Sequence, residues 1–207
     1  EEIPARFLAG GVAELQQRVV ALLDDFDASY EFIGNDGDVL YVLTNLDAPR
    51  YRVIAIRADG EDMKEIIPEA EDVLEEVRII DGTFVTSYLT DAHSRIAVFK
   101  RDGSGMKNLE LPALGSVSSI TGERKDREMF YAFESFLYPT TIYRYDFETG
   151  ETSVFRSPQI PFDGGAFVTE QVFYPSKDGT NIPMFVTHKR GLELDGTSPT
   201  YLYGYGG

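Results

Sequence analysis

The chain has 207 residues, of which 43% are hydrophobic and 26% are charged, the composition of a globular protein large enough for one or two domains. Acidic residues outnumber basic ones by 35 to 19, and the formal charge of -16 excludes nucleic acid and anionic membranes as expected partners. Because cysteine is absent, the chain offers no disulfide, no thiolate nucleophile and no cysteine metal site.

The sequence places the protein in a compartment only loosely. No run approaches the roughly 18 to 20 apolar residues of a membrane span, and the acidic N-terminus is unlike a secretory signal. We expect a soluble protein in the cytoplasm, with the periplasm as the alternative, since a cysteine-free chain suits both. A start without methionine and an end at Gly207 suggest a piece of a larger protein.

Short runs of alternating apolar and polar residues, the pattern of β-strands, begin near residue 30. The first two flank Asn35-Asp36-Gly37, which predicts a hairpin because these residue types tolerate positive φ. A third run covers 51–58, and a fourth short strand follows the turn ADGED. The acidic run over 69–76 is predicted to be a solvated connection with a helical turn.

The same order of four runs then recurs twice. The second set covers 74–81, 84–91, 95–103 and 106–112, and the third covers 117–122, 128–135, 141–150 and 151–157. A further run over 18–23 is expected to be the outer strand of a preceding blade. The last strands of the sets are spaced by about 44 residues, a period typical of four-stranded propeller blades, around Val20, Ile66, Leu109 and Val154.

The alternative architecture is a non-repeating antiparallel sandwich. The recurring turns ADGED, RDGSG and ETGET favour blades, and the absence of tryptophan excludes the tryptophan-aspartate type of propeller repeat. The segments at 24–27 and 101–105 lack the ligand spacing of a calcium loop, so we predict a solvated acidic loop at the first, a turn at the second, and no metal site at either.

The pattern changes near residue 160. Two prolines and two glycines within 157–167 predict a linker. Beyond it, two strands flank a turn at Lys177-Asp178-Gly179, a polar loop covers 191–199, and a final strand is predicted over 200–207.

Several segments resemble the prolyl oligopeptidase family of serine peptidases, at the point where a seven-bladed propeller is followed by a hydrolase domain. The most specific are YPSKDGTNIPMF and the terminal YGYGG. The likeness continues upstream through GSVSSITGERKDREMFYAFESFLYPTTIYRYD, TNLDAPRYRVI and DDFDASYEFIGNDG, so it covers nearly all of the chain after about Leu22.

The resemblance implies a mainly β fold with about three four-stranded blades plus a stray strand, followed by the first strands of an α/β-hydrolase domain. Residues 1–160 would form the C-terminal part of the seven-bladed β-propeller. Residues 161–207 would form the linker and the N-terminal strands of the peptidase domain.

The resemblance also implies a role for Tyr205, the second tyrosine of YGYGG, as one donor of the oxyanion hole. A fixed donor about 3 Å from the developing oxyanion lowers the barrier to acyl transfer. The glycines at 204, 206 and 207 would let the backbone turn steeply beside the ring. The alternative for Tyr205 is an aromatic packed at a strand end, which is the interpretation we prefer for Tyr203.

The catalytic triad of the family, serine then aspartate then histidine, is expected beyond Gly207. No G-x-S-x-G motif occurs in the sequence. His93 and His188 precede the expected nucleophile, so they are not the catalytic histidine, and we predict surface or strand-end positions for both. The chain alone is expected to be inactive.

By resemblance, the whole enzyme would hydrolyse short peptides on the carboxyl side of proline, without metal or organic cofactor, behind a propeller that restricts access. One alternative is a non-catalytic propeller that binds a protein partner, with YGYGG as a structural remnant. Another is a related oligopeptidase with basic specificity. Because three blades cannot close a ring, the exposed blade edges lead us to expect self-association of the isolated chain.

Overall fold

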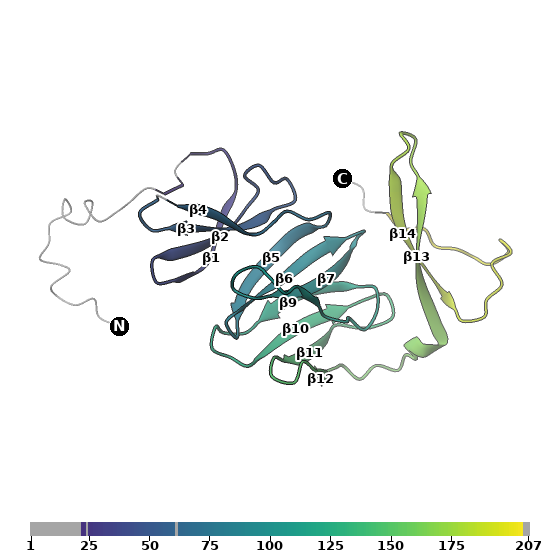
Figure 1. Ribbon diagram of the computed structural model, residues 1–207. Coiled ribbons are helices and arrows are strands. Elements are labelled where there is room, and N and C mark those ends of the chain that lie inside the picture. Colours follow the sequence, from purple (N-terminus) through teal and green to yellow (C-terminus); the bar gives the residue numbers. More distant parts are fainter. Residues whose placement is uncertain (1–21, 24, 61, 205–207) are drawn as a thin grey trace, which may run out of the picture.

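The structure is a computed structural model that describes residues 22–23, 25–60 and 62–204 (Figure 1). The described part is built of β-strands and has one short 3-10 turn, at Gly164–Ala166. No helix within these residues is long and apolar enough to cross a membrane. The predicted mainly β fold is therefore confirmed.

Three four-stranded antiparallel sheets follow one another, and each takes its strands in sequence order. Blade 1 comprises β1 (Tyr30–Asp36), β2 (Val39–Thr44), β3 (Arg52–Arg57) and β4 (Met63–Ile67). Blade 2 comprises β5 (Val73–Ile80), β6 (Thr83–Thr90), β7 (His93–Phe99) and β8 (Lys107–Asn108). Blade 3 comprises β9 (Ser116–Thr121), β10 (Glu128–Glu134), β11 (Thr141–Asp146) and β12 (Thr152–Arg156). Such up-and-down sheets in series are propeller blades, and the sandwich alternative is wrong.

The hydrophobic core lies between neighbouring blades. Side chains alternate across a strand, so each blade offers one apolar face to the blade before it and one to the blade after it. In β6, for example, Phe84 belongs to the cluster shared by blades 1 and 2, while Val85 belongs to the cluster shared by blades 2 and 3. Both side chains are fully buried. The blades therefore depend on stacking for their cores.

Two expectations about strand positions need correction, and a third falls mostly outside the described residues. The run over 69–76 is not a connection throughout, because β5 begins at Val73 and Leu74 is buried. A register shift between Leu74 and Glu76 turns the leucine into the core while the acidic side chains remain outside. The strand predicted over 106–112 is reduced to β8 at Lys107–Asn108. Of the predicted stray strand, 18–21 (including Val20) lies outside the described residues, and Leu22 and Leu23 form a bend.

The two ends of the blades differ in the turns that they carry. In a four-stranded meander, the turns after the first and third strands lie at one end, which we call the paired-turn end. The turn after the second strand lies at the other, the single-turn end. In blade 2, Asp81-Gly82 and Arg101 to Gly105 therefore lie at the paired-turn end, and Asp91-Ala92 lies at the single-turn end.

The last two strands form a separate hairpin, β13 (Phe167–Pro175) and β14 (Asn181–Lys189). Its nine residue pairs run without a register shift. The linker reaches it through the 3-10 turn, where the Asp163 carboxylate accepts a hydrogen bond from the Gly165 amide at 3.0 Å. Figure 1 shows the hairpin beside the stacked blades, at the end of the series.

Candidate functional site

Tyr205, the predicted oxyanion-hole donor, lies outside the described residues, as do Gly206 and Gly207. The residues that lead to it are described, and they correct two expectations. Residues 200–204 form no strand, and Tyr203 is 74% exposed and therefore not packed at a strand end. The hairpin strands pair only with each other, so they supply no partner strand to this segment.

The two histidines lie at the ends of strands, as predicted. His93 is the first residue of β7, and His188 is the last but one of β14. Nδ1 of His188 donates a hydrogen bond to the Lys189 carbonyl oxygen at 2.9 Å. In the described part of the chain, no group of three or more histidine and acidic side chains could hold a metal ion.

The motif that carries the resemblance, YPSKDGTNIPMF, forms the tip of the β13–β14 hairpin. The predicted turn is present, and Gly179 takes a positive φ of 88° there. The Asp178 carboxylate accepts hydrogen bonds from the Ser176 hydroxyl and from the Thr180 amide, the latter at 3.0 Å. These bonds, the serine bond foremost, lower the pKa of Asp178 to about 2, so the carboxylate stays ionised.

The hairpin contacts the blades at their single-turn end. The side-chain amide of Gln171 donates to the Asp91 carbonyl oxygen at 2.5 Å. The Phe136 and Phe185 rings lie 5.7 Å apart. Beside them is an open hollow of about 500 Å³, lined by Leu114, Phe136, Tyr138, Pro139 and Phe185 among others. A surface that unites blades and hairpin is a natural place for a ligand.

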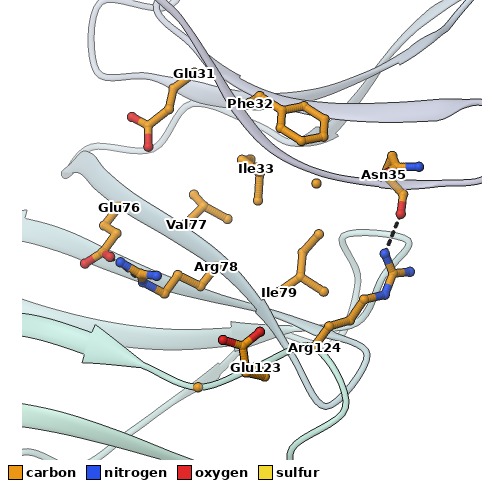
Figure 2. A pocket seen from close by; sticks show the side chains of 12 residues that line it. Glu31, Phe32, Ile33, Asn35, Glu76, Val77, Arg78, Ile79, Glu123 and Arg124 are labelled. Atoms are coloured by element: carbon orange, nitrogen blue, oxygen red, sulfur yellow. Dashed lines mark hydrogen bonds and ion pairs between the residues drawn. The ribbon is translucent and has the colours of Figure 1, made fainter. Parts of the chain in front are cut away.

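A second hollow, which we call the inner hollow, lies where the first strands of the blades meet (Figure 2). It measures about 370 Å³ and is lined by residues 31–35 of β1, 76–79 of β5 and 122–124 after β9. Gly34 lets β1 approach β5, since a Cβ there would lie 2.8 Å from Cδ1 of Ile79. Figure 2 shows Val77 and Ile79 between charged side chains.

The charges of the inner hollow are only partly paired. Glu76 and Arg78 form an ion pair at 2.6 Å, and Arg124 donates to the Asn35 carbonyl oxygen. The carboxylates of Glu31 and Glu123 have no ion-pair partner among the described residues. Phe32 presents an apolar ring nearby and is 62% exposed. This surface suits an extended ligand with both polar and apolar groups.

The sequence contained a signal for the inner hollow that single-residue reasoning missed. Glu31 and Glu76 are 45 positions apart, which matches the blade repeat. Superposing the repeats would have placed both acids on the first strand of their blades and so on the same surface. Arg124 carries no such signal, because its position follows from the packing of three blades.

Comparison with known proteins identifies the family. Residues 11–158 match the family described as prolyl oligopeptidase, N-terminal beta-propeller domain. A prolyl endopeptidase of Elizabethkingia meningoseptica is 35% identical over 191 residues, which are 91% of this chain and 27% of that protein. A prolyl endopeptidase of Dictyostelium discoideum is 37% identical over 92% of this chain and 27% of its own length. The chain thus spans about a quarter of the length of these relatives.

Solved structures agree with this assignment. A chain from a structural study of two prolyl endopeptidases superposes with a TM-score of 0.79 at 38% identity, covering 90% of this chain and 28% of that one. Prolyl oligopeptidase B from Galerina marginata superposes with a TM-score of 0.78 at 33% identity, covering 86% of this chain and 26% of that one. By its blades, its sequence and its superposition, the chain belongs to the prolyl oligopeptidase family of serine peptidases.

Proposed function

We propose that this chain is a segment of a serine endopeptidase that hydrolyses short peptides on the carboxyl side of proline. The observation that carries the proposal is the continuous likeness to a solved prolyl endopeptidase, at 38% identity over 90% of the chain. A match over 90% of the chain extends beyond the three blades, which occupy residues 30–156. Relatives with bound peptide substrates, such as prolyl oligopeptidase B from Galerina marginata, support a peptide as the ligand.

We place the boundary between the two parts near residue 160. Residues 1–160 belong to the propeller, and residues 161–207 are the linker and the first strands of an α/β-hydrolase domain. The hairpin supports this division, because neither β13 nor β14 contains a buried residue. Two strands without a core of their own need a further layer for stability.

Tyr205 is the proposed oxyanion-hole donor of the intact enzyme. The support comes from its place in YGYGG and from the exposure of the preceding residues Tyr201, Leu202 and Tyr203. Gly204 has nothing within 4 Å of the position of a Cβ. The nucleophile, the acid and the histidine of the triad are expected beyond Gly207, so we expect the chain by itself to be inactive.

The propeller is proposed to restrict access to the active site. The hairpin, as the start of the hydrolase domain, meets the blades at their single-turn end through Gln171 and Phe136. The inner hollow lies on the surface that would line the centre of the completed ring. An extended peptide can lie along such a surface, whereas a folded protein cannot.

The proposal is tested by cleavage of matched chromogenic tripeptides that differ only in the residue before the scissile bond. The full-length protein should cleave the proline peptide with a kcat/KM at least about a hundredfold above the alanine and arginine peptides. A preference for arginine would instead identify the related oligopeptidase of basic specificity. Failure to cleave any of the three, together with no labelling by a serine-directed phosphonate, would identify a non-catalytic binding propeller.

Self-association of the isolated chain stays a prediction. Blade 3 ends in β12, all of whose residues are exposed, including Val154 and Phe155. An uncovered apolar strand at a sheet edge is a site for unwanted pairing.

A further inference from the structure

One carboxylate at the paired-turn end interacts with side chains from all three blades, through hydrogen bonds and ion pairs. Asp36 ends β1 in blade 1, and its carboxylate accepts a hydrogen bond from Nη2 of Arg101, in the β7–β8 turn of blade 2, at 2.5 Å. It also forms an ion pair with Arg124, which follows β9 in blade 3. Within blade 1, the Tyr41 hydroxyl donates to it at 3.0 Å.

Arg124 connects two blades that are not neighbours. Besides its ion pair with Asp36, its Nη1 donates to the Asn35 carbonyl oxygen (Figure 2). The two larger apolar clusters, by contrast, each join adjacent blades. The link from blade 3 to blade 1 is possible only because the first strands of the blades converge at the inner hollow, which Asn35 and Arg124 line.

Arg101 is held in place by packing as well as by charge. Its guanidinium lies 4.1 Å from the centre of the Tyr41 ring and 4.4 Å from that of the Phe84 ring. One ring belongs to blade 1 and the other to blade 2. Burial between them lowers the pKa of Arg101 from its ordinary value, because desolvation disfavours the charged guanidinium. A carboxylate partner is therefore important to this arginine.

The turn that carries Arg101 rests directly on blade 1. Gly103 has a φ of 82°, and a Cβ there would overlap the Ile66 carbonyl oxygen of β4. The glycine thus allows the turn to lie against the neighbouring backbone. Its position brings Arg101 over Tyr41 and within reach of Asp36.

The corresponding turns of the other blades lack this arrangement. Asp81 and Asp126 follow Asp36 at intervals of 45 residues, so all three occupy the same place in the repeat. The Asp81 side chain makes no hydrogen bond or ion pair with any described residue. The Asp126 carboxylate accepts only a hydrogen bond within its own turn, from the Glu123 amide at 2.7 Å. The position of Asp36 in the blade repeat therefore does not by itself explain its contacts with the other blades.

We propose that Asp36 forms an ionic link between blade 3 and blade 1 across blade 2. This ionic link would fix the opening of the inner hollow at the paired-turn end. The functional consequence rests on the proposed peptidase activity. In the intact enzyme, a looser paired-turn end would admit longer peptides, while the chemistry at the single-turn end would be unchanged.

The test compares Asp36→Asn with Asp81→Asn in the full-length protein. Asparagine keeps the size of the side chain and an acceptor for Tyr41, but it removes the charge that both arginines need. Hydrogen exchange should become about tenfold faster in the β1–β2 turn and in residues 122–127 for Asp36→Asn, and stay at the wild-type rate for Asp81→Asn. Arg124→Gln should reproduce the change from the other side of the ion pair.

Unchanged hydrogen exchange in both Asp36→Asn and Arg124→Gln would show that the ionic link does not hold blades 1 and 3 together. The second measurement is the ratio of kcat/KM for a long proline-containing peptide to that for a tripeptide. This ratio should rise several-fold in Asp36→Asn, while kcat/KM for the tripeptide stays unaffected. An unchanged ratio would show that the ionic link does not control the entry of long peptides. If the wild-type protein cleaves neither peptide, the proposed function fails, and the hydrogen-exchange experiment still decides whether the ionic link exists.

Discussion

The blades and the hairpin are both antiparallel β-structure, yet they bury their residues very differently. In β6, five consecutive residues from Phe84 to Tyr88 are buried. In β13 and β14, every residue is half-buried or exposed, although β13 carries phenylalanine, valine and tyrosine like the blade strands. The difference lies in the neighbours: blade 2 has a sheet on each side, whereas the hairpin contacts the blades through Gln171 and Phe185, near the middle of its two strands. Burial here is a property of stacking rather than of strand composition.

The blades and the hairpin also differ in the regularity of their strand pairing. Each blade contains a shift in its strand pairing, at Phe32/Gly34, Leu74/Glu76 and Ala132/Phe133, whereas β13 and β14 pair without interruption. A bulge increases the local twist of a strand. Strongly twisted sheets can stack face to face around an axis, so the bulges belong to the blade architecture and are not needed in the hairpin.

The largest difference should appear when a phenylalanine is removed from each region. Phe133 is fully buried in blade 3, and Phe133→Ala should lower the free energy of unfolding by about 3–5 kcal/mol through lost burial and a cavity. Phe173 in β13 is 49% exposed, and Phe173→Ala should cost less than about 1 kcal/mol. Urea unfolding followed by circular dichroism measures both. Equal costs would mean that the hairpin has a core comparable to that of the blades.

A comparison of two glycines, one in each region, separates the effect of the contact between blades from the effect of backbone strain. Gly103 and Gly179 have φ angles of 82° and 88°, but only Gly103 would place a Cβ against a neighbouring blade. Alanine at either position costs about 1–2 kcal/mol for the left-handed conformation. Gly103→Ala should cost about 1–3 kcal/mol more because of the overlap with Ile66. Similar unfolding midpoints for the two variants would show that the β7–β8 turn does not rest on blade 1.

The smallest effect concerns two turn aspartates, one in each region. Asp178 in the hairpin has a pKa of about 2, and hydrogen bonds from the amides of Thr149 and Glu148 also lower the pKa of Asp146 in blade 3. An unfolded aspartate has a pKa of about 3.9, so the stabilisation from Asp178 is complete above that pH and is lost as the pH falls toward 2.

Carbon-13 NMR titration of the carboxyl groups measures both midpoints. Ser176→Ala should raise the midpoint of Asp178 and leave that of Asp146 in place, because the serine hydroxyl is the largest cause of the shift at Asp178. An ordinary midpoint for Asp178 in the wild-type protein would exclude the hydrogen-bonded turn.

Much of the blade architecture could be predicted from the sequence, because strand period and turn residues are local signals. The turns at Asn35-Asp36-Gly37 and Lys177-Asp178-Gly179 lie where their residue types require them. The strand predicted over 74–81 corresponds to β5 at Val73–Ile80, but the solvated connection predicted over 69–76 was too long, since the acidic residues around Leu74 conceal a bulge that turns the leucine into the core.

The contacts between blades could not be predicted in this way. The bonds of Asp36 reach residues 65 and 88 positions later, and they depend on how three sheets stack. No local pattern distinguishes Asp36 from Asp81, which occupies the same turn of the next blade. The terminal strand predicted over 200–207 is absent from its described part, 200–204, for a related reason, since a strand needs a partner that alternation alone does not supply.

The most direct measurement is the steady-state kinetics of Tyr205→Phe in the full-length protein with a proline-containing tripeptide. Removal of one oxyanion-hole donor should lower kcat by about a hundredfold to a thousandfold, with KM and the unfolding midpoint close to those of the wild-type protein. Tyr203→Phe, two residues earlier, is the matched control and should retain full turnover. Unchanged kcat in Tyr205→Phe would contradict the assignment of this chain to the catalytic machinery of a prolyl peptidase.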